Sequence, residues 1–471
     1  MGMIGLGTMG RNLLLNMADN GFSVAGYDKD NKQLDLLTEE GKGKNVKAFD
    51  TLTEFAASLE IPRVVVLLVP AGKIVDAIIQ ELELVLEKGD IIIDSGNSYF
   101  KDTDTRVASL SLKGFHFFGM GISGGEEGAR KGPSIMPGGD KEAYQYMKPV
   151  LEAISAKFNT EPCVAYIGPG SAGHFVKMVH NGIEYGQMQL IADTYGIMQK
   201  TLGLSNDEIG DIFGKWNQGP LQSYLLEISA EIMHYRDESS DDFLLDIIKD
   251  EARSKGTGKW TSQVAMDLGI PIPTIDIAVA MRDLSRYKKL RVALDERYPR
   301  KIDMSIANKD EFLQHLHNSL YFGMISLYAQ GLHMLFQASE DYKYNLNIKE
   351  IAAIWRAGCI IRSAFLDRIT QAYAKNNSLE HLFLDDDVKQ IQDQLTPSLP
   401  VVLQHSFLKG ISVPAYASLW SYYLASTTGR LSSNLIQAQR DFFGAHTYER
   451  IDKEGVFHTN WNNIPSTKTD I

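Results

Sequence analysis

The chain has 471 residues, of which 44% are hydrophobic, so we expect two or three domains, each with its own core. Its net charge of −12 argues against a nucleic-acid partner, and no apolar run approaches the roughly 20 residues of a membrane span. The two cysteines, Cys163 and Cys359, lie far apart and outside any ligand spacing. This usage fits neither a disulfide framework nor a structural zinc site, and it predicts no metal and a cytoplasmic location.

The first predicted element is a strand at Met3-Ile4 that leads directly into a glycine-rich turn. The pattern GxGxxG occupies residues 5–10, a helical pattern follows it, and a second strand over residues 22–28 ends at Asp28. In dinucleotide-binding folds such glycines allow a tight turn and close approach of a pyrophosphate, which meets the free N–H groups of the helix N-terminus. An acidic residue at the end of the second strand completes the pattern. We therefore predict a dinucleotide held by Gly5, Leu6, Gly7, Thr8, Met9 and Gly10.

Further strands follow over residues 64–69, 91–94 and 115–121. The first two are continuously apolar and end at Pro70 and at Ser95-Gly96-Asn97, as buried parallel strands do. An α/β sheet of this kind binds ligands at the carboxyl ends of its strands. We predict a Rossmann-type domain over residues 1–170.

Beyond residue 170 the strand signals vanish, and long amphipathic stretches run to about residue 430. Residues 180–186 are echoed at residues 317–323, and Trp216 and its neighbours are echoed at Trp355. A period this long indicates a duplicated all-helical domain. We place this domain at residues 171–432, with repeats of about 173–310 and 311–432, and a C-terminal segment at residues 433–471.

The most informative helix carries Lys177, Asn181 and Glu184. Their spacing of i, i+4 and i+7 puts all three on one face, where a base and an acid two turns apart could move protons at two ends of a small substrate. An ordinary solvated helix face has the same spacing. The second repeat has Gln314 and Tyr321 at the positions of Lys177 and Glu184, so the fold does not require this pair. That difference favours chemistry in the first repeat.

Three other segments are candidates for anion binding. Ser123-Gly124-Gly125 offers a hydroxyl and backbone N–H groups that could hold a carboxylate, although a simple tight turn has the same residues. Lys255-Gly256-Thr257-Gly258-Lys259-Trp260 is a glycine-rich loop suited to a phosphate, but it is not the Walker pattern. Arg282 could add a bidentate donor or form a surface ion pair.

The end of the chain is also unusual. Residues 439–446 carry an arginine and a histidine among aromatic residues, and residues 456–461 add two large rings, Phe457 and Trp461. Such a tail seldom packs alone, and we expect it to lie across a partner subunit rather than to be disordered.

Taken together, these motifs resemble the decarboxylating 6-phosphogluconate dehydrogenases over nearly the whole chain. The resemblance rests on residues 5–10, 93–97, 121–129, 177–184, 255–260, 359–363 and 440–446, in the order of the family. It implies oxidation of 6-phosphogluconate at carbon 3, loss of carbon dioxide and release of ribulose 5-phosphate in the oxidative pentose phosphate pathway.

The resemblance also implies residue roles. Lys177 is the general base toward the 3-hydroxyl and then the acid toward the carbonyl oxygen, while Glu184 protonates carbon 1 of the enediol. The carboxylate and hydroxyls are oriented by Asn97, Ser123, Gly124, Gly125, His180 and Asn181. The phosphate is bound by Tyr185, Lys255, Arg282 and Arg440, and the pocket is closed by His446. In the family Arg440 and His446 reach the other subunit's site, so a homodimer is implied.

The cofactor site departs from the family pattern. NADP-using members have Asn-Arg-Thr or Asn-Arg-Ser where this chain has Asp28-Lys29-Asp30. Asp28 would accept a hydrogen bond from a free ribose 2′-hydroxyl and repel a phosphate, with partial compensation by Lys29 and Lys32. We predict NAD preference or dual use of NAD and NADP, with Val69 and Asn97 also at the cofactor.

Two other functions fit parts of the sequence. Another β-hydroxyacid dehydrogenase would act on a small acid without phosphate, but such chains lack the second helical repeat and the Lys255 and Arg440 motifs. A non-catalytic dinucleotide sensor on the same fold is disfavoured by the presence of both Lys177 and Glu184.

Overall fold

The computed structural model describes residues 1–300 and 306–461 and divides into two compact units, Met1–Leu419 and Trp420–Ile471. The first unit opens with a seven-stranded sheet in the order β3-β2-β1-β4-β5-β6-β7. Six strands are parallel, and β7 runs antiparallel to β6 at one edge. The strands are β1 (Gly2–Ile4), β2 (Val24–Tyr27), β3 (Val46–Phe49), β4 (Val64–Leu67), β5 (Ile91–Asp94), β6 (His116–Ser123) and β7 (Ser134–Gly138).

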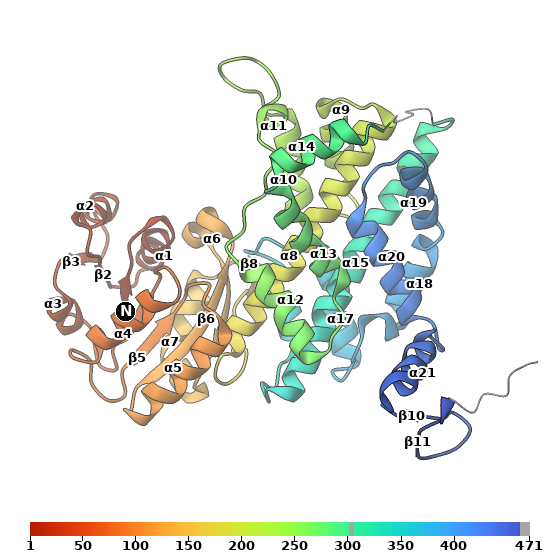
Figure 1. Cartoon of the computed structure of the whole chain (residues 1–471). Coiled ribbons are helices and arrows are strands. Elements are labelled where there is room, and N and C mark those ends of the chain that lie inside the picture. Colours follow the sequence, from red (N-terminus) through yellow and green to blue (C-terminus); the bar gives the residue numbers. More distant parts are fainter. Residues whose placement is uncertain (301–305, 462–471) are drawn as a thin grey trace, which may run out of the picture. The chain divides into compact units, whose positions relative to one another are not determined.

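Helices cover both faces of this sheet (Figure 1). Alternate residues of a strand point to opposite faces, so Val64 and Val66 pack into one core and Val65 and Leu67 into the other. The predicted Rossmann-type α/β fold is confirmed, whereas β3 and β7 were not predicted. The helices of this part are α1 (Thr8–Asp19), α2 (Asn31–Glu40), α3 (Leu52–Ala57), α4 (Lys73–Leu82), α5 (Phe100–Leu112), α6 (Gly125–Lys131) and α7 (Lys141–Ile154).

The rest of the first unit is mostly helical, as predicted, apart from the short strand pair β8 (Lys157–Phe158) and β9 (Glu161–Pro162). The first helices are α8 (Ala172–Ile197) with a π-helical end at Met198–Leu202, α9 (Asn206–Trp216), α10 (Tyr224–His234), α11 (Leu244–Ile247), α12 (Thr257–Leu268), α13 (Pro273–Ser285) and α14 (Lys288–Arg297). They are followed by α15 (Lys309–Asp341), α16 (Ile348–Ile354), α17 (Phe365–Lys375), a 3₁₀ turn at Leu382–Leu384, α18 (Asp386–Leu395), α19 (Ser398–Leu408) and α20 (Pro414–Ser426), which crosses the boundary between the units at Leu419.

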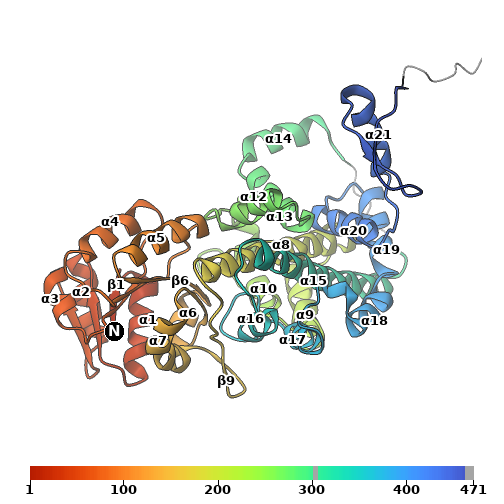
Figure 2. The same ribbon diagram turned by 90° about the horizontal axis from the view of Figure 1, so that it is seen from below.

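The two repeats make reciprocal contacts through the long helices α8 and α15, which lie side by side (Figure 2). A Cβ placed on Gly186 would lie 2.3 Å from the Leu327 side chain, and one placed on Gly323 would lie 2.8 Å from Leu190. These four residues correspond pairwise between the predicted repeats, so the contact between α8 and α15 is reciprocal. The domain and repeat boundaries near residues 170, 310 and 432 stay predictions.

The second unit contains α21 (Ser433–Gly444) and an antiparallel pair, β10 (Tyr448–Glu449) and β11 (Val456–Phe457). The predicted C-terminal segment extends past Trp461 into residues 462–471, which lie outside the described residues. Among the described residues, no helix is both long enough and apolar enough to cross a membrane.

Candidate active site

The glycine-rich turn lies between β1 and α1. A Cβ on Gly5, whose φ is +92°, would lie 2.6 Å from Leu68 O, and one on Gly10 would lie 1.9 Å from Gly5 O. Gly7 differs, because a Cβ there would meet nothing within 4 Å. It is the N-cap residue of α1, and no side chain caps the N–H groups at the start of this helix. Two glycines therefore serve the packing of the turn, while the third leaves an open approach to the helix N-terminus. This arrangement fits a dinucleotide pyrophosphate.

Asp28, at the end of β2, ties this turn to the sheet. Its Oδ2 accepts a hydrogen bond from Leu6 N at 2.7 Å, and its Oδ1 accepts one from Asp30 N at 2.9 Å. A carboxylate can accept more than two hydrogen bonds, so a ribose hydroxyl could donate a third one to Asp28. The neighbouring Lys29 forms an ion pair with Glu81 of α4, with Nζ and Oε1 2.7 Å apart. The local positive charge is thus partly neutralised.

The other cofactor candidates border the same turn. Thr8 is exposed and Met9 half-buried in the first turn of α1. Val69 follows β4, and its Cγ1 would lie 2.7 Å from a Cβ on Gly5.

The loop after β5 carries Asn97, whose side chain is exposed. The buried Asp94 organises this loop by accepting hydrogen bonds from Gly96 N at 3.0 Å and Ser98 Oγ at 2.6 Å. Arg106 of α5 donates to the same carboxylate at 3.2 Å. Asp94 belongs to the motif at residues 93–97, whereas the role of Arg106 was not predicted, because its contact with Asp94 joins separate elements and leaves no local pattern.

Helix α8 packs directly against the sheet at a row of glycines. A Cβ on Gly121 of β6 would lie 2.4 Å from the Cβ of Lys177, and one on Gly119 would lie 2.7 Å from His174 Nδ1. From the helix side, a Cβ on Gly173 would lie 2.2 Å from Gly119 O. Only residues without side chains allow this approach, which buries the first half of α8 and with it Lys177.

Lys177 belongs to a buried hydrogen-bond chain. Its Nζ donates to Asn181 Oδ1 at 2.9 Å, which confirms that the two share a helix face. His180 Nδ1 lies 3.2 Å from the same oxygen, and His180 Nε2 lies 3.2 Å from Ser123 Oγ. Because Asn181 Oδ1 can only accept, the imidazole proton lies on Nδ1 of His180. The other ring nitrogen, Nε2, then accepts a hydrogen bond from the Ser123 hydroxyl. Ser123 Oγ also accepts from Ile360 N at 3.4 Å, a contact that was not predicted although Ile360 lies in the motif at residues 359–363.

Burial controls the charges at this site. It lowers the pKa of Lys177, with the Glu184 carboxylate opposing the shift, and it lowers the pKa of His180 well below its ordinary value. Burial likewise raises the pKa of Glu184, opposed by Lys177 and Arg282. Both members of the Lys177–Glu184 pair are therefore pushed toward their neutral forms, a free amine and a carboxylic acid. The solvated-face alternative is wrong, because Lys177 is only 7% exposed.

The turn after β6 presents one open glycine. A Cβ on Gly124 would lie 2.6 Å from Gly358 O, whereas one on Gly125 would meet nothing within 4 Å. The strand runs as far as Ser123, two residues beyond its predicted end, and α6 starts at Gly125.

Three phosphate candidates lie on neighbouring elements. The Arg282 guanidinium of α13 stacks 3.4 Å above the centre of the Tyr185 ring on α8. A Cβ on Gly258 would lie 2.5 Å from that ring, so the start of α12 rests on Tyr185. Lys255 is exposed in the segment just before α12. Tyr185 and Arg282 are thus brought together, with the glycine-rich loop beside them.

Arg440 and His446 belong to the second unit. Arg440 lies on α21 and His446 in the turn after it, and both side chains are exposed.

Comparison with known proteins identifies the family. A model of the NAD binding domain of 6-phosphogluconate dehydrogenase matches residues 1–168, and a model of the 6-phosphogluconate dehydrogenase C-terminal domain matches residues 173–461. The chain belongs to the 6-phosphogluconate dehydrogenase family. It is 50% identical over 462 residues to the NADP(+)-dependent, decarboxylating 6-phosphogluconate dehydrogenase of Bacillus subtilis (strain 168), covering 98% of both chains.

Other members of the 6-phosphogluconate dehydrogenase family are similarly close. The decarboxylating enzyme of Escherichia coli (strain K12) is 48% identical over 462 residues, again with 98% of both chains covered. A Plasmodium falciparum 6-phosphogluconate dehydrogenase, studied in its apo form, with NADP+ and with 6-phosphogluconate, has 43% identity and a TM-score of 0.96. The match covers 98% of this chain and 100% of that one.

Within residues 1–300 and 306–461, no group of three or more His, Cys, Asp or Glu side chains is arranged to hold a metal ion.

Proposed function

We propose that this chain catalyses the oxidative decarboxylation of 6-phosphogluconate to ribulose 5-phosphate and carbon dioxide with a nicotinamide dinucleotide. The observation that carries the proposal is the buried Lys177, which shares a face of α8 with Asn181 and Glu184 in a member of this family. Burial lowers the pKa of Lys177 and so favours the neutral amine that a general base requires.

Lys177 acts first as the base. Its free amine takes the proton of the 3-hydroxyl, and Asn181 orients the amine through the 2.9 Å hydrogen bond. A nicotinamide dinucleotide held at the glycine-rich turn of residues 5–10 would supply the acceptor for the hydride that leaves carbon 3. Lys177 now carries the extra proton and gives it to the carbonyl oxygen as the bond to the carboxylate breaks and carbon dioxide leaves.

Glu184 completes the reaction as an acid. The product of decarboxylation is an enediol. The carbon that becomes C1 of ribulose 5-phosphate must gain a proton, and the adjacent hydroxyl must return its proton to the Lys177 amine as the ketone forms. Because burial raises the pKa of Glu184, its protonated form is available for this step. The neutral His180 and Ser123 would orient the substrate together with Asn97, Gly124 and Gly125.

The substrate phosphate would lie against Tyr185, Arg282 and Lys255. We propose that Arg440 and His446 reach this site from the second subunit of a homodimer, as the resemblance implies. Guanidinium groups suit phosphate because their donors match its oxygens in pairs. The two cysteines, both free thiols, agree with a cytoplasmic location.

For the cofactor we propose NAD preference or dual use, although the Bacillus subtilis relative is named NADP(+)-dependent. A 2′-phosphate near Asp28 would meet a carboxylate, and Lys29 is already paired with Glu81. A free 2′-hydroxyl would instead donate to Asp28.

The test is steady-state turnover of 6-phosphogluconate with NAD and with NADP, following reduced nicotinamide and carbon dioxide together. Equal yields of the two products support oxidative decarboxylation, and a higher kcat/KM with NAD supports the role of Asp28. Strong NADP preference would contradict that role. Absence of turnover with both cofactors would contradict the proposed activity and favour a dinucleotide sensor.

A further inference from the structure

In the second unit, the segment after α21 folds back on that helix around one buried carboxylate. Asp441 of α21 is 0% exposed and accepts hydrogen bonds at both oxygens. Its Oδ1 accepts from Thr447 N at 2.9 Å and from His458 Nδ1 at 2.9 Å. Its Oδ2 accepts from Thr459 N at 3.1 Å and from Trp461 Nε1 at 2.8 Å. Two separate stretches of the tail therefore converge on a single side chain.

The carboxylate stays charged over the working pH range. Burial alone would raise the pKa of Asp441, but hydrogen bonds from His458, Thr459 and Trp461 lower it to about 2. An ionised carboxylate accepts hydrogen bonds and donates none, so it suits four converging donors.

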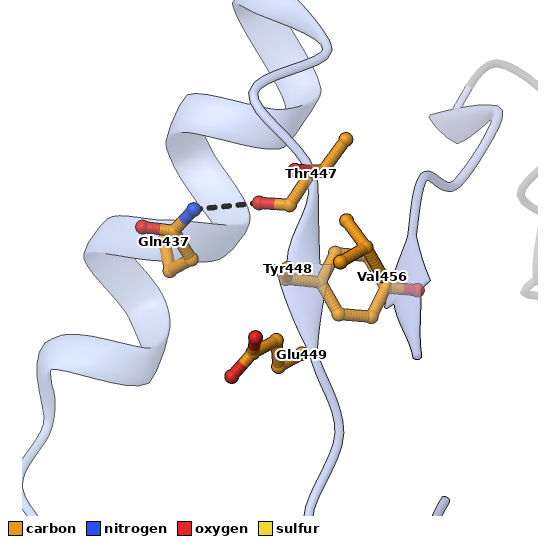
Figure 3. Close-up of a pocket in the computed structure, with 5 residues that line it drawn as sticks. All are labelled: Gln437, Thr447, Tyr448, Glu449 and Val456. Carbon is orange, nitrogen blue, oxygen red and sulfur yellow. Dashed lines mark hydrogen bonds between the residues drawn. The ribbon is translucent and has the colours of Figure 1, made fainter. Parts of the chain in front are cut away.

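A second side chain of α21, Gln437, holds the same turn. Its Nε2 donates to the carbonyl oxygen of Thr447 at 2.6 Å, as the dashed line in Figure 3 marks. Its Oε1 accepts from Arg440 Nη1 at 3.2 Å. Thr447 is thus fixed at its N–H by Asp441 and at its carbonyl by Gln437, which also orients Arg440.

The turn itself needs this support. Ala445 has a φ of +51° and Thr447 a φ of +61°, a region that residues with a Cβ avoid, especially β-branched ones. His446 lies between them, and its ring covers Gly444, where an added Cβ would lie 2.7 Å from the imidazole. A backbone with positive φ at such residues is retained only where surrounding contacts stabilise it. The Asp441 and Gln437 bonds are such contacts.

We propose that Asp441 is a positioning residue of the substrate-phosphate site, fixing the turn that presents His446 next to Arg440 on the same helix. Arg440 immediately precedes Asp441, and Thr447, which Asp441 binds, immediately follows His446. The inference rests on the proposed function, in which Arg440 and His446 reach the phosphate site.

The experiment compares Asp441→Asn with Asp452→Asn in the full-length protein. Asp452 is exposed in the same unit and pairs with Arg450 through bonds of 2.8 and 2.7 Å, so both variants lose one negative charge but only one loses the buried acceptor. An asparagine retains one acceptor oxygen and gains a donor that faces N–H groups. The readouts are kcat, KM for 6-phosphogluconate, KM for the dinucleotide and the inhibition constant of inorganic phosphate, with Arg440→Ala as reference.

We expect Asp441→Asn and Arg440→Ala each to raise KM for 6-phosphogluconate by about tenfold or more and to weaken phosphate inhibition in parallel. The KM for the dinucleotide should change by less than about twofold, and Asp452→Asn should match the wild type. A loss that is merely structural would instead lower the amount of active enzyme and leave both KM values unchanged.

Two results separate the inference from the proposed function. If Arg440→Ala raises KM and Asp441→Asn behaves like Asp452→Asn, the positioning role is overturned and the phosphate role stands. If Arg440→Ala has no effect on KM, the phosphate role itself fails.

Trp461→Phe provides the test if Asp441→Asn does not fold. It removes only the Nε1–H donor and keeps a ring near Phe442, whose centre lies 6.0 Å from that of Trp461. We expect roughly a twofold to fivefold rise in KM for 6-phosphogluconate, in line with the loss of one hydrogen bond. An unchanged KM would overturn the inference.

Discussion

Lys177 donates a hydrogen bond to Asn181 at 2.9 Å, and its counterpart in the second repeat, Gln314, donates one to Asn318 at the same distance. The parallel extends to the histidines. His180 packs edge-on against Trp355 with ring centres 5.5 Å apart, and the matching pair, His317 with Trp216, is 5.3 Å apart. The bond to the asparagine and the histidine–tryptophan contact are therefore common to both repeats. The amine of Lys177 distinguishes the first repeat from the second.

Lys177→Gln tests this distinction, because it gives the first repeat the residue of the second. We expect the fold and the bond to Asn181 to be retained, while kcat falls by about 10²–10⁴, since an amide cannot accept the proton. Thermal unfolding and turnover measure the two effects. The matched control is Gln314→Lys at an exposed position, which should leave turnover unchanged. Wild-type turnover in Lys177→Gln would remove the proposed base.

Glu184→Gln should separate the two halves of the reaction. The amide has nearly the same shape but cannot donate a proton to carbon, so we expect a drop in steady-state turnover of about 10²-fold or more. Hydride transfer precedes this step, so rapid mixing should still show a first turnover of reduced nicotinamide at close to the wild-type rate. Equal slowing of the first turnover and the steady state would assign Glu184 to the oxidation step instead.

Gly7→Ala and Gly10→Ala should act on different properties. An added methyl at Gly7 meets no atom within 4 Å, so we expect the free energy of unfolding to change by less than about 0.5 kcal/mol. The same methyl would intrude on a bound pyrophosphate, and the KM for the dinucleotide should rise by roughly tenfold. At Gly10 a Cβ would lie 1.9 Å from Gly5 O, so that variant should be destabilised by about 1–3 kcal/mol. Denaturant unfolding and dinucleotide kinetics distinguish the two outcomes.

The buried Asp193 predicts how stability depends on pH. Its Oδ2 accepts from Ala415 N at 2.8 Å at the start of α20, and burial raises its pKa to about 7. Between about pH 4 and 7 the folded protein holds a proton that the unfolded chain has released, so stability falls as pH rises, by at most ~4 kcal/mol. Thermal unfolding of Asp193→Asn should therefore lose less stability than the wild type between about pH 5 and 8. Parallel curves for the two proteins would contradict the assignment.

Much of the fold was accessible from local patterns. The turn at residues 5–10 and strands at 64–69 and 91–94 were predicted, because glycine spacing and apolar runs act within a few residues; in the structure the first of these strands, β4, ends at Leu67. The face shared by Lys177 and Asn181 followed from helical periodicity alone. The edge strand β7 was missed, since its Ser-Ile-Met-Pro-Gly sequence has no distinctive pattern and it is stabilised by pairing with β6.

The sequence by itself determined which residue types could do the chemistry and on which elements they lie. Only the tertiary structure decided that Lys177 is buried, because that depends on glycines of β6 and of α8 meeting across the domain. It also decided that Asp28 already accepts the N–H of Leu6, and that Asp441 gathers four donors from the tail. Periodicity and turn chemistry act between near neighbours in the chain, whereas burial and the pairing of polar groups are set by residues that meet only once the chain has folded.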